Sequence, residues 1–85
     1  SEVKVLHNAV CREHIIMKVG NGPASRQPVI EIANLFRAKV VNVAESRLML
    51  ELTGEPEKID SFIGLLQPYG VKEIVRTGIS ALERD

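Results

Sequence analysis

The sequence is short of the residue types that most often reveal a function. Its 85 residues include no tryptophan, one tyrosine, two phenylalanines and a single cysteine. One cysteine excludes an internal disulfide and fits a reducing compartment, so we expect a cytoplasmic protein. No apolar run approaches the roughly 20 residues that cross a bilayer, so we expect no membrane association.

An excess of charge of one sign is also missing. Eleven basic and eleven acidic side chains cancel, so the domain has no bulk electrostatic attraction to nucleic acid. RNA-binding modules with the fold plan derived below need stacking aromatics on the strands of the sheet. Phe36 and Phe62 instead fall on the apolar stripes of expected helices, and Tyr69 falls in a loop. We therefore expect no nucleic acid as a partner.

What the sequence does contain is one pattern that occurs twice, thirty residues apart. A stripe of apolar residues at helical spacing is followed each time by a β-branched run. A helix with one apolar face cannot bury that face alone, but two such units can cover one sheet. The matching stripes are Val29, Ile32, Ala33 and Phe36 in the first half, and Ile59, Phe62, Ile63 and Leu66 in the second.

The pattern predicts an α+β domain with the order strand, helix, strand, strand, helix, strand. Ser25 and Glu55 are the expected helix N-caps, with Pro56 at the first helical position of the second helix. This is the ferredoxin-like βαββαβ plan, a four-stranded antiparallel sheet with both helices on one face. The expected strands are 15–19, 39–44, 47–53 and 71–76, while 79–82 either adds a short closing strand or packs on the rim.

The strand at 47–53 alternates between apolar and polar residues, which indicates one covered face and one partly polar face. Leu48, Leu50 and Leu52 are expected to point toward the core. The opposite face is expected to carry Arg47, Met49 and Glu51, joined by Ile16 and Lys18 of the first strand.

A sheet face that mixes methionine, isoleucine and charge is typical of a surface that docks onto another protein. A second copy of the chain is the simplest such partner, so the sequence predicts a homodimer. Arginine is also enriched at interfaces. The candidate partner-contact residues are Arg37, Arg47, Met49 and Arg76.

His7, Cys11 and His14 are the only soft metal ligands grouped in the sequence. Their spacing fits no strong zinc pattern and no fourth ligand is evident, so the alternative is a linker with a small apolar cysteine and two exposed imidazoles. A nucleophilic cysteine would need a base and an orienting group, and no third member accompanies Cys11 and His14. We assign no metal site and no catalytic residue.

The segment Gly20-Asn21-Gly22 precedes the first helix and is either an anion cradle or a plain turn. An acylphosphatase-type enzyme would need an arginine-bearing phosphate loop at this place. Arg26 is the only candidate for that arginine, and no supporting motif surrounds it.

Three stretches, 32–43, 51–62 and 66–78, together resemble the C-terminal domain of the small, regulatory subunit of acetolactate synthase (acetohydroxyacid synthase). Phe-Arg-Ala-Lys at 36–39 and Pro-Tyr-Gly with Arg-Thr-Gly within 68–78 are the most specific parts. The resemblance runs from about residue 12 to residue 84. The chain departs from the family pattern at Asn42 and Glu55, where aspartate is usual, and at His14, where an aliphatic residue is usual.

The resemblance implies that residues 12–85 form a C-terminal ferredoxin-like domain. It implies that residues 1–11 are a linker or the end of an N-terminal ACT domain, whose last strand would end at Val3 to Leu6. The function implied is regulatory and non-catalytic, in subunit assembly and in feedback control of valine, leucine and isoleucine biosynthesis. The implied partner is the large catalytic subunit, which holds the thiamine diphosphate, flavin and magnesium, so no cofactor is expected here. The alternative is a stand-alone amino-acid-binding module of the same fold.

Overall fold

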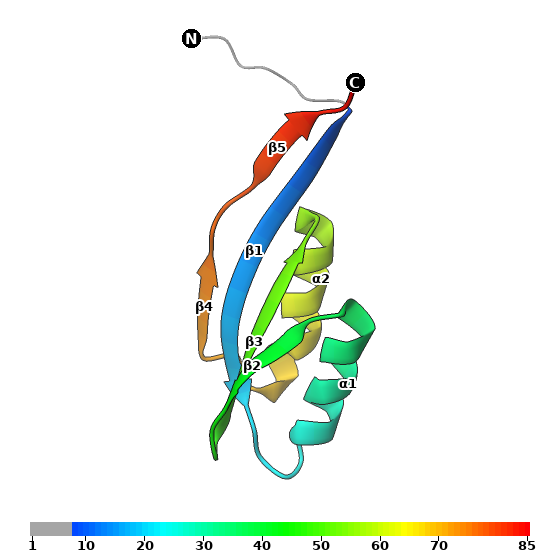
Figure 1. Cartoon of the computed structure of the whole chain (residues 1–85). Coiled ribbons are helices and arrows are strands. Elements are labelled where there is room, and N and C mark those ends of the chain that lie inside the picture. Colours follow the sequence, from blue (N-terminus) through cyan, green and yellow to red (C-terminus); the bar gives the residue numbers. More distant parts are fainter. Residues whose placement is uncertain (1–7) are drawn as a thin grey trace.

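The computed structural model describes residues 8–85, and its elements follow the expected order with one addition (Figure 1). All strand pairs are antiparallel, in the order β2-β3-β1-β4, with β5 paired to β1. Both helices lie on the same face of the sheet, which confirms the ferredoxin-like fold. The elements are β1 Ala9–Gly20, α1 Arg26–Phe36, β2 Lys39–Val43, β3 Arg47–Gly54, α2 Pro56–Leu66, a 3-10 turn Gln67–Tyr69, β4 Glu73–Arg76 and β5 Ser80–Glu83.

The first strand is longer than the expected 15–19, and the sheet has five strands where four were expected. β4 pairs with the inner part of β1, and β5 pairs with its first residues, Ala9 to Arg12. Of the two alternatives for 79–82, the closing strand is therefore correct. The β1–β5 ribbon projects beyond the ends of the helices (Figure 1).

Ala9 to Cys11 belong to the segment expected to be a linker or the end of an N-terminal domain, and they are paired residues of β1. The polar run Arg12-Glu13-His14 hides this part of the strand from an apolar-periodicity reading. The domain boundary between residues 11 and 12 stays a prediction. Val3 to Leu6 and His7 lie outside the described residues.

The core lies between the helices and the inner face of β1 and β3. The predicted alternation is confirmed, because Leu48, Leu50 and Leu52 are at most 3% exposed. Full burial of such a side chain stabilises the fold by about 1.5–3 kcal/mol. The other core residues are Ile15, Met17, Val19, Val29, Ala33, Ile59, Phe62 and Leu66.

The two helical stripes meet at their phenylalanines. The rings of Phe36 and Phe62 pack with centroids 5.2 Å apart at an interplanar angle of 52°. Phe62 is fully buried, whereas Phe36 is partly buried at the margin of the core. The repeated pattern therefore predicted correctly that both phenylalanines lie on the core-facing sides of their helices.

The helix N-termini begin where the sequence predicted, at Ser25 and Glu55, but neither side chain caps its helix. The Ser25 hydroxyl instead accepts a hydrogen bond from the Gly22 N–H, at 3.1 Å, and so closes the preceding turn. The helices are held mainly by packing of their apolar faces, as is usual for short helices in proteins.

The end of β1 lies against the turn that follows α2. The Gly20 N–H donates to the Gly70 carbonyl at 3.1 Å, and a Cβ at Gly20 would lie 2.6 Å from the Tyr69 carbonyl oxygen. Only glycine permits this close approach of two backbone segments.

Candidate interaction surfaces

The face of the sheet opposite the helices is uncovered. Register places Lys18 beside Met49 and Ile16 beside Glu51 on this open face. Two shallow hollows of about 240 and 210 Å³ lie on it, and Lys18 and Met49 line both. Ile16, Lys18, Arg47, Met49 and Glu51 are all half-buried, on the face where the sequence placed them.

Charges of both signs are interleaved on the open face. The Lys18 ammonium lies 3.6 Å from the Glu73 carboxylate, across the β1–β4 pair. The His14 imidazole shares a 2.8 Å hydrogen bond with the Glu51 carboxylate, between β1 and β3. Among the described residues, the Arg47 guanidinium has one hydrogen-bond partner, the Ser46 carbonyl of its own neighbour, at 2.9 Å. This mixture leaves no strong net field of one sign on the open face.

Arg76, expected at a partner contact, lies on the helix side of the sheet and is bound within the domain. Its Nε donates to one oxygen of the Glu13 carboxylate at 3.0 Å, and its Nη2 donates to the other. The same Nη2 donates to Asp60 of α2 at 3.0 Å. This cluster ties β1, β4 and α2 together.

The Glu13 carboxylate is 5% exposed, and Arg76 supplies the charge that makes its burial tolerable. The hydrogen bonds from Arg76 hold the pKa of the Glu13 carboxyl below its usual range, although burial opposes that shift. The hydrogen bonds that Arg76 donates to Glu13 and Asp60 raise the pKa of Arg76. The sequence reading missed this cluster. The available signal was Glu13 itself, which is in phase with the core-facing Ile15 and Met17.

Arg37 lies at the C-terminal end of α1, in a left-handed backbone conformation with φ 59° and ψ 36°. Its side chain is exposed, and no residue within 8–85 hydrogen-bonds or ion-pairs with its guanidinium. Arg37 and Arg76, both candidate contact residues from the sequence, therefore differ in the structure. The Arg76 guanidinium is bound within the domain, whereas no described residue binds the Arg37 guanidinium.

The Gly20-Asn21-Gly22 segment is a turn held by a buried amide. Asn21 is 2% exposed, and its Nδ2 donates to the Ala44 carbonyl at 2.8 Å. Its Oδ1 accepts a hydrogen bond from the Arg26 Nε at 2.8 Å. These bonds join the loop before α1 to the β2–β3 hairpin. This geometry favours the plain turn among the two readings of the segment.

Cys11 and His14 are three residues apart in one strand, and such residues point to opposite faces of a sheet. They therefore do not converge on one ion or form a nucleophile–base pair. Within residues 8–85 no three His, Cys, Asp or Glu side chains are grouped as metal ligands.

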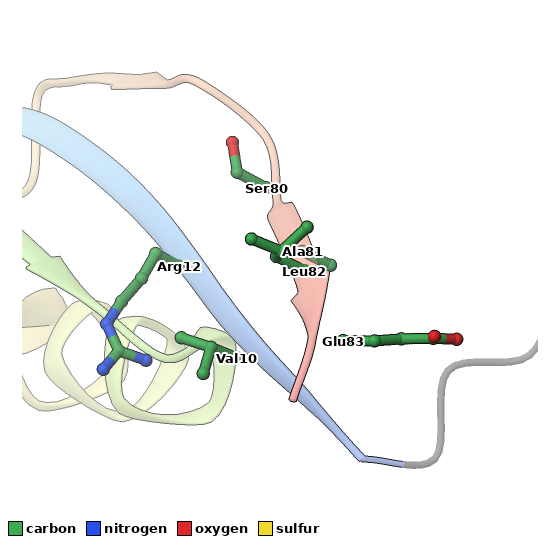
Figure 2. A pocket seen from close by; sticks show the side chains of 6 residues that line it. All are labelled: Val10, Arg12, Ser80, Ala81, Leu82 and Glu83. Carbon is green, nitrogen blue, oxygen red and sulfur yellow. The ribbon is translucent and has the colours of Figure 1, made fainter. Parts of the chain in front are cut away.

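The projecting β1–β5 ribbon carries a hollow of about 440 Å³ on its surface (Figure 2). Val10 from β1 and Leu82 from β5 are its largest apolar residues, and they are 36% and 78% exposed. Arg12 also lines the hollow, and its guanidinium lies 3.9 Å from the Glu55 carboxylate. Figure 2 shows Val10 and Arg12 on β1 and the other lining residues, Ser80 to Glu83, on β5. No helix in the described part of the chain is long and apolar enough to cross a membrane.

Comparison with known proteins places the chain in a family. Residues 12–85 match the family model described as the small subunit of acetolactate synthase. The chain belongs to the acetolactate synthase small-subunit family. It is 43% identical over 77 residues to the acetolactate synthase small subunit of Mycolicibacterium smegmatis, covering 91% of this chain and 45% of that protein.

Two further acetolactate synthase small subunits agree. The Bacillus subtilis protein is 44% identical over 75 residues, covering 88% of this chain and 44% of that protein. The crystal structure of the small subunit from Thermotoga maritima superposes with a TM-score of 0.84 at 36% identity, covering 91% of this chain and 47% of that chain. The resemblance stated from the sequence is thereby confirmed. This chain spans about half the length of the acetolactate synthase small subunits that it matches.

Proposed function

We propose that this domain is a non-catalytic regulatory part of acetolactate synthase. It acts by binding the large catalytic subunit, and it contributes to feedback control of valine, leucine and isoleucine biosynthesis. The observation that carries the proposal is the family match over residues 12–85, together with the closely superposing small subunit of Thermotoga maritima. Regulation of this kind is a coupling free energy between an effector site and the catalytic subunit.

We further propose that the domain forms a homodimer through its open sheet face. The face offers Ile16, Met49 and Val75 as apolar contacts, and Val75 is 65% exposed. Its interleaved charges suit a two-fold contact, in which each surface meets its own copy and a surface of one sign would repel itself. Arg47 and Met49 are the predicted contact residues, whereas Arg76 has an internal role.

The proposal places residues 12–85 in the half of the small subunit that mediates assembly. Effector binding then belongs to the rest of the small subunit, and titration of this chain with valine should show no saturable binding. Saturable binding of valine would instead favour a stand-alone amino-acid-binding module. The cytoplasmic location expected from the single cysteine stays a prediction.

The experiment that tests the regulatory role is an acetolactate synthase assay on the purified large subunit, with and without an excess of this chain. We expect the chain to change the turnover of the large subunit, with little added sensitivity to valine. An unchanged turnover at saturating chain concentration would contradict the regulatory role of this domain.

A further inference from the structure

The β1–β5 ribbon lies outside the core of the domain. Within the described part of the chain, residues 9–12 of β1 pair with β5 alone, because β3 joins β1 from Glu13 onward and β4 joins it from Ile15 onward. All four residues of β5 are exposed, and the core with the residues packed against it runs from Ile15 to Val71. A two-stranded ribbon without a buried face is marginally stable in water. The pairing of β5 with β1 is therefore the weakest part of the sheet.

An arginine makes contacts at each end of the ribbon. Arg12 lies 3.9 Å from the Glu55 carboxylate, and both side chains are more than half exposed, so solvent screens this pair and it contributes little. At the far end, the Arg84 guanidinium donates to the Asn8 side-chain oxygen at 3.2 Å and to the Ala9 carbonyl at 2.9 Å. The Arg84 bonds lie within the ribbon, so they close the end of the chain onto β1 without tying the ribbon to a helix.

The chain is firmly held where the core sheet ends and the ribbon begins. Glu13 is the first buried residue of β1, and Arg76, the last residue of β4, donates to both of its carboxylate oxygens. The Thr77 N–H donates to the His14 carbonyl at 3.0 Å, and the His14 N–H donates to the Thr77 hydroxyl oxygen at 3.2 Å. The backbone of Gly78 also hydrogen-bonds to the Glu13 carboxylate. These contacts fix the core sheet immediately before the connection to β5.

The connection from this boundary to β5 turns at a glycine. Gly78 has a φ of 85°, a backbone conformation that favours glycine, and a Cβ there would meet no atom within 4 Å. The space around Gly78 is therefore open, and no packed group opposes a change of chain direction at this residue. Figure 1 shows β4 and β5 as two separate strands joined by this connection, with β5 alongside the first part of β1.

We propose that β5 is an arm that detaches from β1 and returns as one unit, turning about Gly78, while the core sheet and both helices stay folded. The contact between Glu13 and Arg76 marks where the opening stops. In the open state residues 9–12 of β1 lose their strand partner, so their N–H and C=O groups can pair with another extended segment. Elements that move in regulation are drawn from such low-stability parts of a fold. This inference does not rest on the proposed function, because it concerns the domain alone.

The test is native-state amide hydrogen exchange of the full 85-residue chain, followed by NMR at several urea concentrations below the unfolding transition. The β5 amides that bond to β1 report on the arm, and the β3 amides that bond to β1 report on the core. We expect the β5 amides to exchange about 100-fold faster than the β3 amides or more, with one common opening free energy. Their exchange should also depend less on urea, because opening the arm exposes little surface.

Two matched variants separate the arm from the core. Gly70 has nearly the same φ as Gly78, 84°, but it lies in the turn after α2, where its carbonyl accepts a hydrogen bond from the Gly20 N–H. Alanine is unfavourable at both positions by roughly a factor of ten. Gly78→Ala should therefore speed exchange of the β5 amides about tenfold, because opening relieves the strain. Gly70→Ala should speed exchange of the β3 amides by a similar factor and leave the β5 amides unchanged, because its strain persists when the arm opens.

Four results would overturn the arm. If Gly70→Ala speeds the β5 and β3 amides equally, β5 opens only with the whole domain. If Gly78→Ala leaves the β5 amides unchanged, the chain does not turn at Gly78. Opening free energies that fall steadily along β5 toward the C-terminus would indicate fraying of the chain end in place of one unit. Unprotected β5 amides in the original chain would show that the arm has no closed state.

Discussion

Arg76 of β4 donates hydrogen bonds to both carboxylate oxygens of Glu13 on β1, across 63 positions of sequence. Glu13 is the only buried acidic side chain within residues 8–85, and it points to the same side of β1 as the core residues Ile15 and Met17. The cluster links three elements, β1, β4 and α2, because Asp60 joins it from the helix. The cluster gives the fold a defined pH dependence.

The pH dependence follows from the lowered pKa of Glu13. Its folded-state pKa lies below the usual value of 4.5, so its stabilising contribution is fully present above about 4.5. That contribution is lost as the pH falls through the lower, folded-state pKa. We expect the urea midpoint to fall between pH 5 and pH 3, and to fall less in Glu13→Gln. Glu45→Gln, at the exposed hairpin, is the control, and a Glu13→Gln chain with the same pH profile as the original would contradict the assignment.

The aromatic contact between the two repeat units makes a second prediction. Phe62→Ala should destabilise the domain by about 3–5 kcal/mol, because the side chain is fully buried and a cavity is left behind. Leu65→Ala, three residues further along the same helix but half exposed, should cost less than about 1 kcal/mol. Urea unfolding followed by circular dichroism measures both. Similar losses in the two variants would show that the apolar stripe has been placed on the wrong face of α2.

Replacing glycine by alanine at two positions, Gly20 and Gly64, should change the stability of the fold in opposite directions. Gly20→Ala should destabilise by roughly 1–3 kcal/mol, because its Cβ meets the Tyr69 carbonyl oxygen, a backbone atom that cannot move aside alone. Gly64→Ala should stabilise by up to about 1 kcal/mol, since nothing lies within 4 Å of its Cβ and alanine favours the helix. Thermal unfolding of both variants decides the point, and a stabilising Gly20→Ala would contradict the close packing of β1 against the 3-10 turn.

The homodimer proposed for the open face can be tested at its centre. Met49→Glu places a second carboxylate beside Lys18 and Glu51, and burying that charge between two copies is costly. We expect sedimentation velocity to show the original chain as a dimer and Met49→Glu as a monomer. Leu65→Asp, on the helix side, should stay dimeric. A chain that sediments as a monomer at high concentration without any substitution would remove the proposal.

The sequence was sufficient for the elements whose stabilisation is local and periodic. Apolar residues recur every three to four positions around Val29 and Ile59, which predicts two helices. They alternate with polar residues in 47–53, which predicts a strand. These two patterns were enough to predict α1, α2 and β3. The pairing of β5 with β1 was not predictable in this way. It joins residues more than 65 positions apart, and Arg12, Glu13 and His14 interrupt the apolar pattern of β1.

The candidate contact residues show the same limit. Arg37, Arg47 and Arg76 look alike in sequence, since each follows or precedes an apolar element. Only the fold shows that the Arg76 guanidinium is held by Glu13 and Asp60, while the Arg37 guanidinium has no hydrogen-bond or ion-pair partner within the described residues. An ion pair between strands that are far apart in the sequence leaves no local pattern in either strand. The one signal here is a charged residue, Glu13, at a position where the alternation of β1 places core residues.

The central claim is that this domain is an assembly module of acetolactate synthase. It is tested most directly by analytical ultracentrifugation of the purified large subunit mixed with this chain. The account predicts that the chain co-sediments with the large subunit in a saturable complex. Two independent species, each sedimenting as it does alone across the accessible concentrations, would contradict it.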